Sequence, residues 1–173
     1  DMMKLFGVIM LIAGSTGFSY CMCQDRKKKL LLLKEIKRLF FLMQDEIRYS
    51  GLPITEIIRG VADKISEPFG LALHRVSDNL TWEEGRNLKD VWEQEMSSML
   101  VGLPLSMQQK KWFIKFPDLL GIAEREGQAE ALKGYLKEFD NWIVQCEQEE
   151  KSKNKVIMSM GMATGILLSV LLL

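Results

Sequence analysis

Apolar residues are concentrated near the two ends of the chain, while the middle mixes them with polar residues at helical spacing. Leu5 to Cys23 contains 19 residues without a charge, and Val156 to Leu173 contains 18. A helix needs roughly 20 apolar residues to span a bilayer, with a lower limit of about 17. Each stretch therefore predicts a transmembrane helix of nearly minimal length.

Both stretches have an alternative interpretation. Lys4 ahead of an apolar segment is also typical of a cleaved leader, which would make the chain a secreted helical protein. No small-x-small cleavage site precedes the basic run, however, and Phe18-Ser19-Tyr20-Cys21 lacks the small residue expected before a lipoprotein cysteine. The second stretch could be a buried core helix, but three lysines directly before it favour a membrane span.

The middle of the chain predicts six amphipathic helices and no strand. The first runs from the basic residues after Cys23 to about Tyr49, and its apolar positions are Leu32, Ile36, Leu39, Phe40, Met43 and Ile47. Gly51 predicts its end, and Pro53 suits the first turn of the next helix. No glycine or proline lies between Phe18 and Tyr49, so this helix is expected to continue from the membrane span without a break.

Capping residues and prolines predict where the later helices begin and end. Thr81-Trp82-Glu83-Glu84 and Ser106-Met107-Gln108-Gln109 both fit the capping box, in which two side chains satisfy backbone N–H groups at a helix start. Pro117 predicts a bend or stop in the second of these helices. The last helix is expected to begin after Gly121 and to run into the second uncharged stretch, because nothing breaks helicity between Tyr135 and Met160.

These segments predict an all-α fold, in which an antiparallel helical bundle in the cytoplasm is flanked by N- and C-terminal transmembrane helices. The loops are short, which favours antiparallel neighbours. The expected domains are a transmembrane helix at 1–25, the cytoplasmic helical-bundle domain at 26–155 and a second transmembrane helix at 156–173.

Basic residues collect at the inner ends of the two uncharged stretches: Arg26, Lys27, Lys28 and Lys29 after the first, and Lys151, Lys153 and Lys155 before the second. The positive-inside rule puts both flanks in the cytoplasm and both termini outside it, and we expect these basic residues to contact membrane lipids. Residues 30–150 carry 15 Lys+Arg and 21 Asp+Glu, and the whole chain has a net charge of zero. These balances argue against nucleic acid as a partner.

Motifs for catalysis and cofactor binding are absent from the sequence, which contains no GxxxxGK, HExxH or GxSxG. His74 is expected to be a surface or packing residue, and Cys21, Cys23 and Cys146 do not have the spacing of a metal site. The chain is therefore predicted not to be an enzyme and to need no metal or cofactor. The alternative is a small membrane-bound enzyme or signalling regulator with an unrecognised site, which would require a concave polar pocket with buried ionisable groups.

Small residues occur at four-residue spacing in both predicted spans. Ala13 and Gly17 form such a pair in the first span, and Gly161 and Gly165 form a GxxxG motif in the second. Such pairs allow membrane helices to approach closely. We predict that these four residues pack against other transmembrane helices.

Four features in a fixed order carry a resemblance to a known family. They are the N-terminal span with its basic collar, the segment Met43-Gln44-Asp45-Glu46-Ile47-Arg48-Tyr49 ahead of Pro53, Leu120-Gly121 with Gln128 downstream, and Lys153-Asn154-Lys155-Val156-Ile157-Met158-Ser159-Met160-Gly161 before an aliphatic tail. Over essentially its whole length the chain resembles the stage III sporulation protein AB family of endospore-forming bacteria. It departs at Ile122 to Glu126, where the family usually has an aspartate.

The resemblance implies a structural role in the channel complex that links mother cell and forespore, in the mother-cell membrane around the forespore. It also implies a cytoplasmic domain similar to that of the type II secretion system F protein, an inner-membrane platform that binds an assembly ATPase. The implied partners are the cytoplasmic ATPase of the same operon and other membrane proteins of the channel complex.

Glu46, Tyr49 and Glu56 are the predicted partner-binding residues. Glu46 and Tyr49 lie beside the apolar stripe of the first middle helix, near the turn at Gly51-Leu52-Pro53. Two roles are open for Glu46. It can cap the helix opened by Pro53, with Tyr49 sealing the helix corner, or it can face outward and meet a basic patch on the ATPase.

Overall fold

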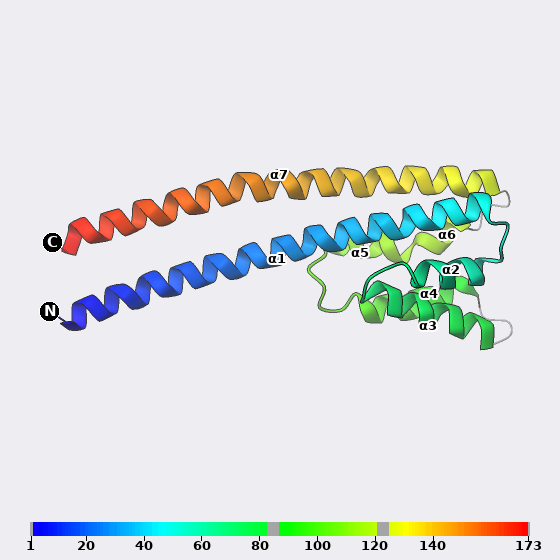
Figure 1. The fold of residues 1–173 in the computed structure, drawn as a ribbon, viewed down its shortest axis with the longest axis horizontal. Helices are drawn as coiled ribbons and strands as arrows, with labels where there is room; N and C mark the ends of the chain where they lie inside the picture. The colour runs from blue at the N-terminus through cyan, green and yellow to red at the C-terminus, as the bar shows by residue number, and fades with distance from the viewer. Residues whose placement is uncertain (1, 83–86, 121–124, 173) are drawn as a thin grey trace. The chain divides into compact units, whose positions relative to one another are not determined.

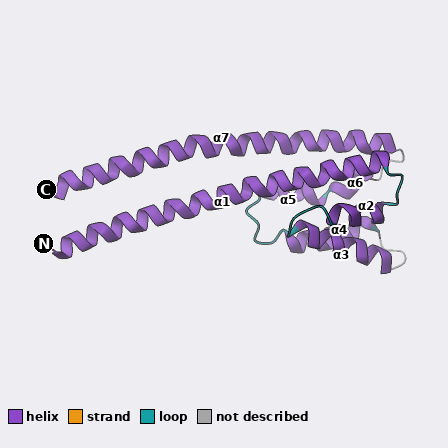
Figure 2. Cartoon of the chain, in the orientation of Figure 1, coloured by secondary structure: helices purple, strands orange, loops and turns teal. Residues whose placement is uncertain are grey.

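A computed structural model of the chain describes residues 2–82, 87–120 and 125–172. Those residues form seven α-helices and no strand, so the predicted all-α class is confirmed (Figures 1 and 2). The helices are α1 (Met2–Tyr49), α2 (Ile54–Ala62), α3 (Phe69–Trp82), α4 (Leu88–Met99), α5 (Met107–Ile114), α6 (Phe116–Leu120) and α7 (Arg125–Leu172). The chain divides into two compact units, one of residues 31–143 and one of residues 1–30 with 144–173.

The first predicted boundary is confirmed, because α1 ends at Tyr49 and Gly51 follows with a φ of 70°. A positive φ is readily adopted by glycine, which has no β-carbon. The Ser50 hydroxyl donates to the Glu46 carbonyl at 2.6 Å and accepts from the Leu52 N–H at 3.2 Å, which fixes the turn. Pro53 is the residue before α2 rather than part of its first turn.

Of the two predicted capping boxes, one is confirmed and one is wrong. Ser106 and Gln109 form both reciprocal hydrogen bonds at the start of α5. Thr81, in contrast, lies in the last turn of α3, where its hydroxyl donates to the Ser77 carbonyl at 2.8 Å. Threonine in a helix can satisfy its hydroxyl in this way, so the pattern alone does not mark a start. The next helix begins later, capped by Asn87, and Glu83 and Glu84 lie outside the described residues.

An aromatic core lies in the 31–143 unit, centred on the fully buried Phe40 of α1. The Phe40 ring centroid lies 4.9 Å from that of Phe116, 5.5 Å from Phe113 and 5.6 Å from Phe139. Trp92 of α4 is also fully buried, and its indole N–H donates to the Phe113 carbonyl at 3.1 Å. One cluster therefore joins α1, α4, α5, α6 and α7.

Helices α1 and α7 are antiparallel within this unit. Gln44 of α1 bonds to Ala129 near the start of α7, and Lys37, earlier on α1, pairs with Asp140, later on α7. The short loops do not account for this pairing, because α1 and α7 are not consecutive in the chain.

Helices α2 and α3 form a tight antiparallel hairpin. The Ser77 hydroxyl of α3 donates to the Thr55 carbonyl of α2 at 3.2 Å. At the other end of the hairpin, a β-carbon added to Gly70 would lie only 2.5 Å from the Ile65 carbonyl oxygen and 3.0 Å from that of Ala62. The start of α3 thus lies so close to the end of α2 and to the segment after it that only glycine fits at position 70.

In the second unit, α1 before Leu31 and α7 after Ile143 are helical. Among the described residues, no helix meets the length and hydrophobicity required for a membrane crossing. The side chains of most residues in the two uncharged stretches lie outside what the structure describes, and so do the surroundings of Ala13, Gly17, Gly161 and Gly165. The predicted spans, their packing residues and the domain boundaries stay predictions.

Candidate partner-binding site

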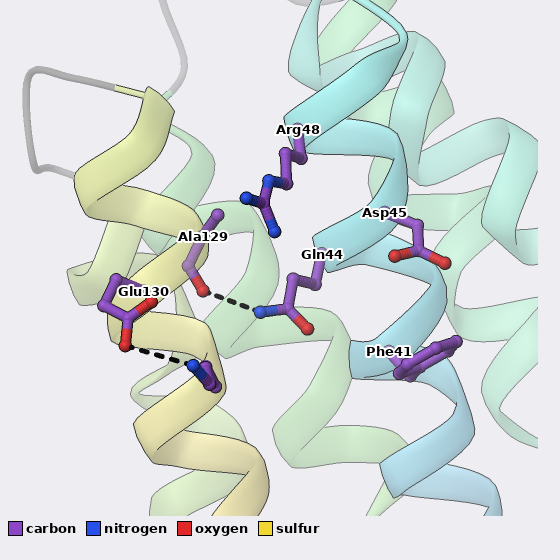
Figure 3. A pocket seen from close by; sticks show the side chains of 7 residues that line it. Phe41, Gln44, Asp45, Arg48, Ala129 and Glu130 are labelled. Carbon is purple, nitrogen blue, oxygen red and sulfur yellow. Dashed lines mark hydrogen bonds and ion pairs between the residues drawn. The ribbon is translucent and has the colours of Figure 1, made fainter.

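A surface groove lies between α1 and α7. Its volume is about 620 Å³, and it is lined by Phe41, Gln44, Asp45, Arg48, Ala129, Glu130 and Lys133 (Figure 3). All of these residues belong to the 31–143 unit. The α1 side of the groove coincides with the segment Met43 to Tyr49 that carries the family resemblance.

The bottom of the groove is held by one hydrogen bond between the two helices. The Gln44 side-chain amide extends from α1 and donates to the Ala129 carbonyl of α7 at 2.8 Å (Figure 3). The Ala129 carbonyl lies in the first turns of α7. The bond therefore fixes the distance between α1 and α7 where Gln44 and Ala129 meet. Gln44 is therefore a structural residue of the groove.

The rim of the groove carries charges of both signs. Asp45 and Arg48 project from α1, while Glu130 and Lys133 of α7 pair with each other at 3.5 Å (Figure 3). These four side chains are exposed. The Arg48 guanidinium also lies 5.5 Å from the centroid of the Tyr49 ring, a cation–π distance.

Phe41 gives the groove an apolar side. It is 51% exposed, although the adjacent Phe40 is completely buried. Exposed aromatic residues beside arginine are typical of protein interfaces, where such residues provide much of the binding energy. The groove therefore has the composition of a docking surface for another protein.

The groove does not have the properties that a catalytic pocket requires. Its ionisable residues are exposed rather than buried, and neither histidine nor cysteine lines it. Within the described ranges, no group of three or more His, Cys, Asp or Glu side chains is arranged to hold a metal ion. His74 lies elsewhere, 3.2 Å from Asp63, and burial raises the pKa of the Cys146 thiol, which opposes formation of a nucleophilic thiolate.

The capping role considered for Glu46 is wrong. Its carboxylate pairs with the Lys64 ammonium at 3.0 Å, and the start of α2 has no side-chain cap. Tyr49 does not seal the helix corner either, because it is 75% exposed. The reason is directional: Glu46 projects toward the residues after α2, not toward its first turn.

The three predicted partner-binding residues are not brought together in the groove. Glu56 is exposed in the first turn of α2, and Tyr49 does not line the groove, although its ring lies beside the Arg48 guanidinium. Whether these residues bind a partner stays a prediction. Phe41, Asp45 and Arg48 were not predicted as a set from the sequence, although their spacing of four and three residues places them on one helix face.

Gln128, another residue of the resemblance, has a structural contact. Its side-chain amide donates to the Leu120 carbonyl at 3.0 Å, across residues 121–124 that lie outside the described ranges. The carbonyl it binds belongs to the last residue of α6, where a helix leaves carbonyls without intrahelical partners.

The basic collars are only partly described. Lys27, Lys28, Lys151 and Lys153 are exposed, Arg26 and Lys29 are partly exposed, and the side chain of Lys155 lies outside the described residues. Exposure leaves these side chains accessible to lipid headgroups, but their predicted lipid contacts stay predictions.

The chain is similar to known proteins over most of its length. The family model described as stage III sporulation protein AB matches residues 4–173. A relative, the stage III sporulation protein AB of Bacillus subtilis (strain 168), is 23% identical over 172 residues, which are 99% of this chain and all of the relative. A solved structure of a stage III sporulation protein AB has the same fold, with a TM-score of 0.65 and 20% identity over 72% of this chain and 98% of that one. The chain belongs to the stage III sporulation protein AB family.

Proposed function

We propose that this family member is a membrane-anchored structural component of the channel complex between mother cell and forespore, and that its helical bundle docks a cytoplasmic ATPase. The observation that carries the proposal is the continuity of α1 and α7. Each is a single helix of 48 residues that belongs both to the aromatic bundle and to one of the uncharged stretches. A bundle built in this way is suited to hold partners at a membrane.

The membrane anchor is supported by the sequence. Leu5 to Cys23 and Val156 to Leu173 reach the minimum length of a span, and both have their basic residues on the side of the bundle. The proposed location is the mother-cell membrane around the forespore, with the bundle in the cytoplasm and both termini outside it. In this location the two anchor helices would contact lipids and other membrane proteins of the complex.

The docking role is supported by the groove. Phe41 offers an exposed aromatic contact, Arg48 offers a charge-assisted one, and the solid core beneath them keeps both in place. The ATPase of the same operon is the proposed occupant, by analogy with the platform role of the type II secretion system F protein.

The test uses the full chain reconstituted in lipid vesicles and the purified ATPase of the operon. We expect Phe41→Ala and Arg48→Glu each to weaken binding about fivefold or more, since the loss of an interface anchor costs more than about 1 kcal/mol. Leu71→Ala is the matched control, because Leu71 of α3 is exposed to a similar extent, 48%, outside the groove. Equal binding by all variants would reject the groove, and no binding at low or moderate salt would reject the ATPase as partner.

A further inference from the structure

Arg48 is a cation of the groove that has no ionic partner. On the opposite wall, Glu130 and Lys133 pair with each other at 3.5 Å. No Asp or Glu in the described part of the chain lies within ion-pair distance of the Arg48 guanidinium, and this includes Asp45 on the preceding turn. Figure 3 shows the Arg48 side chain extending from α1 toward α7. The groove therefore presents a guanidinium whose N–H donors are not used by a carboxylate of the fold.

The Tyr49 ring limits where this guanidinium lies. The guanidinium carbon of Arg48 is placed over the ring, 5.5 Å from its centroid. Tyr49 is the last residue of α1, and the two hydrogen bonds of the Ser50 hydroxyl fix the turn that follows it. A guanidinium can contact an aromatic ring through its charge and still offer its fork of N–H donors to a carboxylate. Tyr49 is thus suited to hold Arg48 in place without occupying the atoms that would bind an anion.

Phe41 forms an apolar contact two turns away from this cation. It lies seven residues before Arg48 on α1, which is about 10 Å along the helix axis. Its side chain is 51% exposed. Between the two, the Gln44 hydrogen bond to Ala129 fixes the distance between the walls. A segment lying in the groove would therefore meet an apolar surface at one end and a guanidinium at the other.

We infer that the groove recognises a carboxylate-bearing segment of the ATPase. An Asp or Glu side chain of this segment binds the Arg48 guanidinium through paired N–H donors, and an apolar side chain about 10 Å away packs on Phe41. Tyr49 is a positioning residue, because it acts by orienting Arg48. This recognition rests on the proposed docking of the ATPase, and it specifies which chemical groups of the ATPase are bound.

The first experiment measures the affinity of the operon's ATPase for the full chain in lipid vesicles. Arg48→Lys keeps the charge but removes the fork of donors, so we expect binding to be about fivefold weaker, as for the loss of one hydrogen bond. Arg75→Lys is the matched control, because Arg75 is exposed on α3 outside the groove. Equal binding by Arg48→Lys and the unmodified chain would overturn the inference, since a single point charge would then be sufficient.

A double-mutant cycle tests the role of Tyr49. Tyr49→Leu removes the ring and should weaken binding about threefold, whereas Tyr49→Phe keeps the ring and should bind like the unmodified chain. In the Arg48→Gln background, Tyr49→Leu should have no further effect, because no guanidinium is left to orient. An equal loss in both backgrounds would mean that Tyr49 contacts the ATPase itself, and would overturn its positioning role.

A crosslink followed by a charge exchange identifies the bound group. A photoreactive phenylalanine analogue at position 41 should capture an ATPase segment that contains an Asp or Glu, and the same analogue at position 71 of α3 should not. Replacing that acidic residue with arginine should weaken binding to the unmodified chain and restore binding to Arg48→Glu.

The outcomes separate this inference from the proposed function. If the unmodified chain binds the ATPase, three results overturn the inference and leave the docking intact: capture of a second copy of this chain, capture of a segment without a carboxylate, or a charge exchange that restores nothing. If the unmodified chain does not bind the ATPase, both proposals are overturned.

Discussion

Phe40 and Phe41 are neighbours on α1 with opposite surroundings. Phe40 is fully buried against the rings of α5, α6 and α7, while Phe41 is half exposed at the edge of the α1–α7 groove. The core face of α1 is explained by packing alone, because each of its apolar side chains fills space that water would otherwise occupy. The groove face has no such explanation, and an exposed phenylalanine there is better accounted for by a partner.

The largest effect is expected on the core face. Phe40→Ala should lower the free energy of unfolding by about 3–5 kcal/mol, because it leaves a cavity among four aromatic rings. Phe41→Ala, which removes the same atoms one residue away, should change it by less than about 1 kcal/mol. Chemical denaturation of both variants measures the difference. Similar losses would show that Phe41 also belongs to the core.

On the groove face, the expected effect is on binding. Arg48→Gln should weaken ATPase binding severalfold and also make it less sensitive to salt, because a charge-assisted contact is lost. Its melting temperature should stay close to that of the unmodified chain, since Arg48 is exposed. An affinity that keeps the same salt dependence would place Arg48 outside the interface.

The Gln44 hydrogen bond between α1 and α7 is expected to contribute both to stability and to the shape of the groove. Gln44→Leu should cost about 1 kcal/mol of stability, because it leaves the Ala129 carbonyl without its side-chain donor. It should also reduce partner binding, since the groove loses its fixed spacing. Gln145→Leu is the control, because it removes the same type of side chain and Gln145 donates to Glu149 within α7, at 3.5 Å, rather than to another helix. Equal effects of both substitutions would argue against a role for Gln44 in the groove.

The buried Tyr135 side chain should make the stability of the core depend on pH in alkaline solution. Its hydroxyl is buried and has no hydrogen-bond partner among the described residues, and burial, with a contribution from the charge of Asp118, raises its pKa above the ordinary 10.0. The folded state thus holds the Tyr135 proton more tightly than the unfolded chain does. Its stability is complete below pH 10 and falls as the pH rises further, because the unfolded chain then loses this proton first. Tyr135→Phe should therefore unfold less readily than the unmodified chain above pH 10 and be equally stable, or slightly more so, at pH 7. A steeper alkaline loss in the variant would contradict this assignment.

The smallest effect is expected at Glu46. Because its contact with Lys64 is an exposed ion pair, Glu46→Gln should cost at most about 0.5 kcal/mol, less than the loss of a helix cap. A thermal melt of Glu46→Gln beside Lys64→Gln should show equal small shifts. A larger shift for Glu46→Gln alone would indicate a second contact of the carboxylate.

The sequence predicted features that depend on local chemistry. The end of α1 follows from Gly51, and the start of α5 follows from the pairing of Ser106 with Gln109. The apolar stripe of α1 identified its core residues for the same reason, because helical spacing alone decides which residues share a face. Thr81 shows the limit of this approach, since its hydroxyl could either accept from an N–H at a helix start or donate to a carbonyl one turn back, and only the structure distinguishes the two.

The groove could not be predicted in the same way. Gln44 and Ala129 are 85 residues apart in the chain, so no local pattern shows that they meet. Phe41 appeared in the sequence only as an apolar residue outside the stripe of Phe40 and Met43. The family resemblance pointed to the correct segment but emphasised Glu46 and Tyr49, whereas Asp45 and Arg48 line the groove.

Gly70 has a consequence for how this fold can vary. A hole left at Phe40 can be refilled by enlarging a neighbouring side chain, so the core can drift through compensating pairs of substitutions. At Gly70 the obstacles are main-chain carbonyl oxygens of Ile65 and Ala62, which every residue carries. No exchange of side chains nearby makes room there, and only a shift of α3 away from the end of α2 and the segment after it would do so. The α2–α3 connection is therefore closed even to alanine at this position.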